Sequence, residues 1–141
     1  MYLVDTNLVS EITRPVPNTG VVDWLKTTDP TKIFLSAIAI AELQLGLELL
    51  PEGRRRDKLT ATIDGFVTQV AAARIVAFGE VDARQFGRIV ARRQHAGRPI
   101  KELDAQIAAS AATRGFAVVT RNVADFEHCG IDVINPWKVQ A

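Results

Sequence analysis

Two stretches near opposite ends of the chain end an apolar run with small polar residues. The first is YLVDTN at residues 2–7, and the second is FAVVTRN at residues 116–122. Asp5, Thr120 and Asn122 therefore follow what read as short buried strands. Such residues commonly cap the next helix or form a turn. In α/β proteins, however, ligands bind beyond the carboxyl ends of the strands, which is where these side chains would lie.

Glu42 is an acid in the middle of an apolar segment. This segment predicts a helix over 37–50, and the helical period places Ile38, Leu45 and Leu49 on the same face as Glu42. An isolated carboxylate in apolar surroundings costs several kcal/mol or takes up a proton. Glu42 therefore requires a buried Arg or Lys partner, a metal ion or a water-filled cleft.

Asp104 and Asp125 complete a set of four acids. Asp104 opens an alanine-rich helix predicted over 104–114, whose small side chains allow a close approach to the sheet. Asp125 follows the second strand end. Taken alone, Asp104 is explained as a helix N-cap, and the residues after Thr120 as an Asx-turn before a short helix at 123–127. Three acids at strand ends and a helix start, together with Glu42 in its apolar segment, favour a binding site.

Four carboxylates in one crevice repel one another unless a cation lies among them. The possible ligands are all oxygen atoms, which favours a hard ion such as Mg²⁺ or Mn²⁺. A zinc site is disfavoured because Cys129 is the only cysteine and because His95 and His128 lack ligand spacing. Oxygen-bound magnesium that keeps part of its water shell is typical of phosphoryl chemistry.

A phosphate polymer would require cations near such a pocket. The helix predicted over 80–96 carries arginines at every fourth position, with Phe86, Ile89 and Val90 on the opposite side. Cations of this kind position a phosphate backbone without reading its sequence. The candidate RNA-binding residues are Arg84, Arg88, Arg92, Arg93 and Arg98. A solvated helix face explains the same pattern.

The elements that must position these residues alternate along the chain. Short apolar segments without polar alternation indicate strands covered on both faces. We therefore expect an α/β fold, a three-layer α/β/α sandwich around a central, mostly parallel sheet of four to five short strands. The strands are expected at 2–4, 33–35, 74–78, 116–119 and 131–134, and the helices at 20–27, 37–50, 55–72, 80–96 and 104–114.

Composition is that of a globular chain. The 141 residues suffice for a single domain, residues 1–141, with a substantial core. A hydrophobic share of 48% with 23% charged residues argues against disorder, and the net charge of +1 identifies no partner. No secretory signal or membrane-spanning apolar run is visible, so the cytoplasm is the expected compartment.

In their order and spacing, these motifs resemble those of PIN-domain ribonucleases, specifically the VapC/FitB-like toxins of type II toxin–antitoxin systems. The resemblance rests on YLVDTNLVSE, FLSAIAIAELQLGLELLPEGRRR and AGRPIKELDAQIAASAATRGFAVVTRNVADFEHCGIDVINPW, which together cover nearly the whole chain. It implies a PIN-domain fold and a Mg²⁺- or Mn²⁺-dependent endoribonuclease toxin. Such an enzyme hydrolyses RNA phosphodiester bonds with a metal-activated water.

The resemblance also implies roles for individual residues. The core metal-binding acids would be, by motif position, Asp5, Glu42 and Asp104. The fourth acid of the family can occupy either of two places, and Asn122 stands at the earlier one, which leaves Asp125 as the expected fourth acid. Thr120 would hold Asp5 by a hydrogen bond, and Asn7 would support it in a similar way.

Partners follow from the same resemblance. It implies a homodimer and a cognate VapB/FitA-like antitoxin whose C-terminal segment covers the active site. The substrate would be RNA. DNA would be reached only through the antitoxin, because the chain itself carries no DNA-reading motif.

Two other classes of protein compete with this interpretation. A phosphatase with Asp5 as nucleophile requires a second acid two residues later, where this chain has Asn7. A catalytically inactive PIN-fold module for RNA binding or protein interaction is the main alternative. Metal-dependent cleavage of RNA in the absence of antitoxin would separate it from the nuclease.

Overall fold

Five short apolar segments pair into one parallel sheet in the computed structural model, which describes residues 1–71 and 74–139. The strands are β1 (Tyr2–Val4), β2 (Ile33–Ser36), β3 (Ile75–Val76), β4 (Ala117–Val119) and β5 (Val133–Ile134). Their order is β3-β2-β1-β4-β5, and all neighbouring pairs run parallel. Val4 lies level with Leu35 on one side and Val119 on the other. Asp5 and Thr120, the next residues after β1 and β4, therefore meet at one edge of the sheet.

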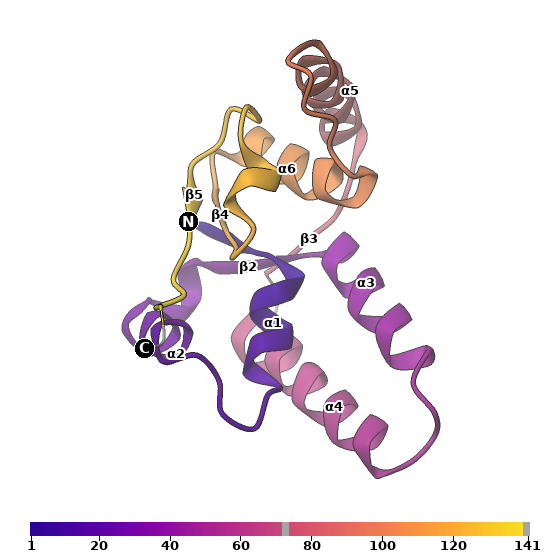
Figure 1. Ribbon diagram of the computed structural model, residues 1–141, viewed down its shortest axis with the longest axis vertical. Coiled ribbons are helices and arrows are strands. Elements are labelled where there is room, and N and C mark those ends of the chain that lie inside the picture. Colours follow the sequence, from indigo (N-terminus) through magenta and orange to yellow (C-terminus); the bar gives the residue numbers. More distant parts are fainter. Residues whose placement is uncertain (72–73, 140–141) are drawn as a thin grey trace.

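Helices cover the sheet on both sides (Figure 1). In that view α5 and α6 lie above the strands, and α1 to α4 lie below them. The helices are α1 (Thr6–Ile12), α2 (Thr19–Thr27), α3 (Ala37–Glu48), α4 (Arg54–Gly65), α5 (Glu80–His95) and α6 (Glu102–Arg114), with 3-10 turns at Pro30–Lys32 and Val123–Phe126. The expected three-layer α/β/α architecture is confirmed. Within the described ranges, no helix has the length and apolar character needed to cross a membrane.

The sequence-based elements are confirmed with small changes at their ends. The helix expected over 55–72 is α4 followed by a π-helical segment, Phe66–Ala71, and its last expected residue lies outside the described part of the chain. Helix α1 was not expected. It has seven residues and begins with the polar pair Thr6 and Asn7, and so short a helix shows little periodicity.

Helix α3 packs on the sheet with a different face from the one that carries Glu42. Its buried residues are Ala39, Leu43 and Leu47. Leu45 and Leu49, which share the helix face of Glu42 by period, are 59% and 76% exposed. Glu42 therefore does share a helix face with apolar residues, as expected, but most of those residues are exposed to solvent in the single chain.

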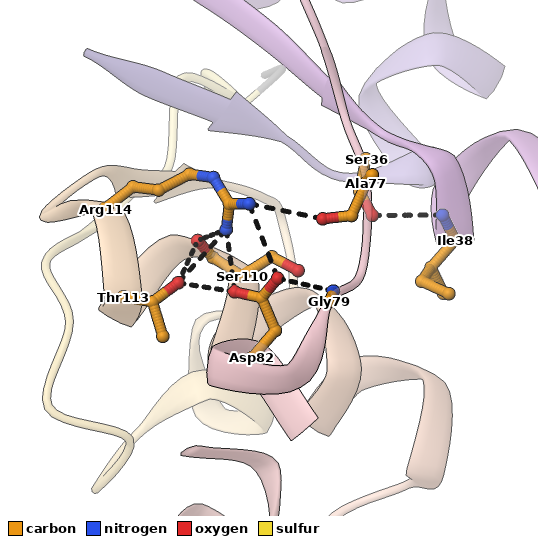
Figure 2. Close-up of polar contacts among 8 residues, drawn as sticks. All are labelled: Ser36, Ile38, Ala77, Gly79, Asp82, Ser110, Thr113 and Arg114. Carbon is orange, nitrogen blue, oxygen red and sulfur yellow. Dashed lines mark hydrogen bonds and ion pairs between the residues drawn. The ribbon is translucent and has the colours of Figure 1, made fainter. Parts of the chain in front are cut away.

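An ion pair between the buried Asp82 and the partly exposed Arg114 joins the start of α5 to the end of α6 (Figure 2). Asp82 accepts hydrogen bonds from Arg114 Nη1 at 2.8 Å, from the Thr113 hydroxyl and from the Gly79 amide at 2.9 Å. Arg114 also donates to the Ala77 carbonyl at 3.2 Å. Burial raises the pKa of Asp82, but these hydrogen bonds outweigh burial and hold the pKa below its ordinary value. The pair fixes the orientation of α6, whose other end carries Asp104.

Candidate active site

The four acids singled out from the sequence lie around one cavity of about 320 Å³. The residues that line it are Asp5, Thr6, Asn7, Glu42, Lys101, Glu102, Leu103, Asp104, Asn122 and Asp125. They come from the ends of β1 and β4 and from the helices that follow β2 and precede β4. Segments far apart in the sequence thus deliver carboxylates to the carboxyl edge of the sheet, as the topology requires.

Asp5 is buried and held by hydrogen bonds on both carboxylate oxygens. Oδ1 accepts from the amide of Thr6 at 2.8 Å and from its hydroxyl at 3.2 Å, so Asp5 is also the N-cap of α1. Oδ2 accepts from the Thr120 hydroxyl at 2.9 Å. The helix-cap interpretation and the site interpretation therefore both apply to Asp5.

The Thr120 hydroxyl has all of its hydrogen-bonding capacity in use. It donates to Asp5 and accepts from Asn7 Nδ2 and from the Asn122 amide, each at 3.0 Å. A hydroxyl has one proton and two lone pairs, so this geometry fixes the rotamer of Thr120 and, through it, that of Asp5. Asn7 supports Asp5 through Thr120 and not directly.

Glu42 has a buried oxygen without a partner. Its Oε1 is buried and accepts no hydrogen bond, and within residues 1–71 and 74–139 no Lys or Arg forms an ion pair with the carboxylate. Burial raises the pKa of Glu42, and the charges of Asp5 and Asp104 raise it further, against Thr6 and Lys101. The described residues therefore do not give Glu42 the buried Arg or Lys partner that was one of its possible explanations.

Asp104 stands in the first turn of α6, but it does not cap that helix, because the N-cap position is Lys101. Burial and the negative charges of Asp5 and Asp125 raise the pKa of Asp104 to about 6, against the opposing charges of Lys101 and Arg93. The carboxylates are therefore close enough to disfavour one another's ionisation. Such mutual repulsion is what a bound cation would relieve.

The segment after β4 presents Asn122 and Asp125 to the cavity. Asn122 occupies the N-cap position of the 3-10 turn Val123–Phe126, but its side chain makes no capping hydrogen bond. The Asp125 amide donates to the Asn122 carbonyl at 3.0 Å, which closes the turn and directs both residues to the same site. The expected short helix at 123–127 is therefore present, and it does not remove these side chains from the cavity.

The arginines expected to bind RNA separate into two groups. Arg84, Arg88 and Arg92 are exposed on α5, and Arg98 is exposed in an ion pair with Glu127. Arg93 is only 5% exposed, and its guanidinium donates to main-chain carbonyls. Its assignment to a phosphate-binding surface is therefore wrong, because its position on α5 turns the side chain inward. The other four do not line the cavity.

Thr6, Glu102 and Leu103 line the cavity although the sequence did not single them out, and Lys101, which the sequence indicates only as an extension of the basic patch toward Asp104, lines it too. Lys101 is the one cation among the cavity-lining residues. It stands one turn before Asp104, and that spacing was the available signal. Thr6 follows Asp5 directly, and its hydroxyl contacts that carboxylate.

The chemistry of the lining residues fits a hard metal ion. The donors are carboxylate and amide oxygens, and Glu42 Oε1 and Asn7 Oδ1 are buried without hydrogen-bond partners. Among the residues that the structure describes, no three His, Cys, Asp or Glu side chains gather closely enough to form a ready-made metal cage. The arrangement in the described residues is thus an acid-lined cavity and not a preformed metal cage.

Comparison with known proteins relates the chain to one family. The PIN domain family model matches residues 2–130. The chain is 36% identical to "Toxin FitB" from Neisseria gonorrhoeae, covering 97% of this chain and 99% of that one, and 36% identical to "VapC ribonuclease Y4jK" from Sinorhizobium fredii, covering 98% and 99%. The structure resembles that of FitAcB from Neisseria gonorrhoeae with a TM-score of 0.90 at 36% identity, covering 99% of this chain and 100% of that one. It resembles FitAB bound to the IR36 DNA fragment with a TM-score of 0.91 at 35% identity, covering 100% and 99%.

Proposed function

This chain belongs to the PIN-domain family, in the group of the VapC and FitB toxins, and on that premise we propose that it is a metal-dependent endoribonuclease toxin controlled by an antitoxin. The observation that carries the proposal is the cavity in which Asp5, Glu42, Asp104 and Asp125 meet. An inactive interaction module would not need to keep the unpartnered Glu42 beside two other acids.

The proposed cofactor is Mg²⁺ or Mn²⁺. Asp5, Glu42 and Asp104 would hold it, with Asp125 as the fourth acid. When bound, such an ion lowers the pKa of water and stabilises negative charge on phosphate oxygens. The raised pKa values of Glu42 and Asp104 support this assignment, because they reflect carboxylates that lack a neutralising partner.

The protein's own residues orient the site and receive the substrate. Thr6 and Thr120 fix the Asp5 carboxylate by the hydrogen bonds described above. Lys101, at the cavity, would contact a phosphate oxygen of the bound RNA. Asn122 is exposed there and can offer an amide to the ribose or the phosphate.

Contacts to the RNA outside the cavity are proposed for the exposed arginines. Arg84, Arg88 and Arg92 present one charged face of α5, and Arg98 follows in the α5–α6 connection. Charges of this kind bind phosphates in any sequence, so they would supply affinity and not the choice of cleavage site.

The proposed protein partners are a second copy of the chain and a VapB/FitA-like antitoxin. We propose that the C-terminal segment of the antitoxin lies across the acid-lined cavity and blocks it. The exposed Leu45 on α3 and Leu49 at its C-cap support a protein partner beside this cavity, since both share the face of Glu42 by helical period. DNA would be contacted through the antitoxin; the similar FitAB complex has been solved bound to the IR36 DNA fragment.

We further propose that residues 1–141 form one PIN domain and act in the cytoplasm, where RNA is accessible. The family match ends at residue 130, but Trp137 and Lys138, beyond that match, contact the same domain. Trp137 Nε1 donates to the buried Glu11 carboxylate at 2.9 Å, and the Lys138 amide donates to Asn18 Oδ1 at 3.0 Å. These contacts support a domain boundary beyond the matched range.

The test is cleavage of a mixed RNA substrate by purified, antitoxin-free protein with Mg²⁺, Mn²⁺ or EDTA. We expect metal-dependent cleavage that Asp5→Asn abolishes, because Asn keeps the size of the side chain but loses its charge. Asp64→Asn, an exposed acid on α4, is the matched control and should cleave like the wild type. RNA binding without cleavage by the wild type would instead support the inactive module. Equal cleavage by wild type and Asp5→Asn would refute the site assignment.

A further inference from the structure

Arg93 is a buried cation whose hydrogen bonds go to main-chain oxygens. Its Nε donates to the Arg98 carbonyl at 2.6 Å. Its Nη1 donates to the carbonyls of Glu127 at 2.7 Å, Asp125 at 3.0 Å and Ala124 at 3.4 Å. Within the described residues, no acid forms an ion pair with it.

The four carbonyls belong to the two segments that carry acids of the cavity. Arg98 lies three residues before Lys101, the N-cap of α6, and Asp104 stands in the first turn of that helix. The other three carbonyls surround Asp125. One guanidinium therefore ties the main chain that leads into Asp104 to the main chain that carries Asp125.

The geometry requires an arginine. Three carbonyls from a four-residue stretch converge on one nitrogen while the opposite side of the planar fork bonds to Arg98, so the orientation of the peptide units beside Asp125 is fixed. A lysine would keep the charge, but its ammonium is a single point and cannot span both segments. A buried cation without a paired carboxylate is costly, so a site that only joined two loops would be stabilised more readily by apolar packing.

We propose that Arg93 is a positioning residue of the acid-lined cavity: it sets Asp125 relative to Asp104 from behind, and it touches neither the RNA nor the metal. This inference rests on the proposed metal-dependent function, because it concerns how the fourth acid is brought to the ion. Arg93 does not line the cavity, which agrees with an action through the main chain. Residues that orient metal ligands in this way commonly change metal affinity by about 10–100-fold when they are replaced.

The experiment is a double-mutant cycle on Mn²⁺ binding, read from the electron paramagnetic resonance signal of free Mn²⁺. The proteins are the wild type, Arg93→Lys, Asp125→Asn and the double variant. We expect Arg93→Lys to raise the Mn²⁺ dissociation constant about tenfold in the wild-type background. In the Asp125→Asn background the same change should raise it by no more than about twofold, because the acid that Arg93 positions is already lost.

A control and a second measurement keep the inference testable. Arg55→Gln removes an exposed charge from α4 and should leave Mn²⁺ binding unchanged. If Arg93→Lys does not fold, the inference is tested in the wild type instead, by following the NMR signal of the Arg93 Nε–H group. In the wild type, Mg²⁺ addition should shift that signal, and the shift should saturate as the metal site fills. In Asp125→Asn, Mg²⁺ addition should leave the signal unchanged. A wild-type signal that does not respond to Mg²⁺ overturns the inference.

The outcomes also separate this inference from the function on which it rests. A wild-type protein that binds neither Mn²⁺ nor Mg²⁺ would refute the metal-dependent function. Normal wild-type binding with no loss in Arg93→Lys would refute only the role of Arg93. An equal loss in both backgrounds would show that Arg93 acts on the whole fold and not through Asp125, and that result would overturn the inference as well.

Discussion

The acid-lined cavity predicts that the metal-free protein is destabilised by its own carboxylates, and Asp104→Asn tests this. The pKa of Asp104 is raised to about 6, against about 4 in an unfolded chain. A shift of that size corresponds to at most about 3 kcal/mol, and solvent screening of a partly exposed side chain reduces it to about 1–2 kcal/mol. We expect Asp104→Asn to be more stable than the wild type by that amount at pH 7 in EDTA.

The sign of the pH dependence follows from the same shift. Because the folded protein takes up this proton at a higher pH than the unfolded chain, the wild type loses stability as pH rises from about 4 to about 6 and stays less stable above that range. Asp104→Asn should lack this loss, so the difference between the two proteins should shrink toward pH 4. Addition of Mn²⁺ at pH 7 should stabilise the wild type and reverse the order.

The assay is urea unfolding followed by circular dichroism at pH 7 and pH 5, with EDTA or Mn²⁺. Glu102→Gln is the matched control, since Glu102 is an exposed acid in the same first turn of α6. Its replacement removes a similar interaction with the helix dipole from an exposed side chain. If Asp104→Asn were less stable than the wild type in EDTA at pH 7, the reasoning that the acids repel one another would be refuted.

Three further contacts are tested by substitution, two of them with a control variant. Thr120→Val should destabilise the protein by about 2 kcal/mol and abolish RNA cleavage, whereas Thr120→Ser should retain both, because only the hydroxyl is needed. Gly20→Ala should lower the unfolding free energy by about 2 kcal/mol, since its Cβ would lie 2.2 Å from a carbonyl oxygen, while Gly87→Ala meets open space and should gain about 0.5–1 kcal/mol in a denaturant titration. Asp82→Asn should cost about 2 kcal/mol near pH 7 by breaking the pair with Arg114, and the difference should disappear as the pH falls below about 4, because the pKa of Asp82 is lowered in the fold.

The position of the cavity could be predicted from the sequence because topology determines it. Asp5 and Thr120 each follow an apolar strand, and adjacent parallel strands in register bring the two residues to the same edge. Asp104 and Glu42 could be placed only approximately, from helix period and composition. The resemblance of the ordered motifs then supplied the role that spacing alone left open.

The burial of Arg93 was available in the sequence, but the stripe at every fourth position obscured it. Arg84, Arg88 and Arg92 define one face of α5, and the next residue lies about 100° away on the helix. Arg93 stands four residues after the fully buried Ile89, which places the two on the same inward face. The helical period therefore places Arg93 on the inward face and the other three arginines of α5 on the exposed face, although their closeness in sequence indicates a single surface.

The exposed face of α3 shows a different limit of sequence analysis. Leu45 and Leu49 follow the same apolar period as a buried face, yet they are largely exposed in the single chain. Period alone reports which residues share a face and not what covers that face. An apolar stripe that binds another chain and one that packs in the core give the same sequence signal, so the partner could be inferred from the family but not from the pattern.

The four acids proposed to bind the metal are restrained to different degrees, and that difference bears on the proposed function. Asp5 is restrained by hydrogen bonds to both carboxylate oxygens, and the main chain beside Asp125 is restrained by Arg93. Glu42 keeps an unpartnered oxygen, and the pKa values of Glu42 and Asp104 are both raised. Fixed acids can define where a cation enters, and acids with raised pKa values gain most from its arrival. For the proposed function, the fold therefore fixes Asp5 and the main chain at Asp125 and leaves Glu42 and Asp104 short of a counter-charge, which would favour cation binding at a cost in stability when no ion is bound.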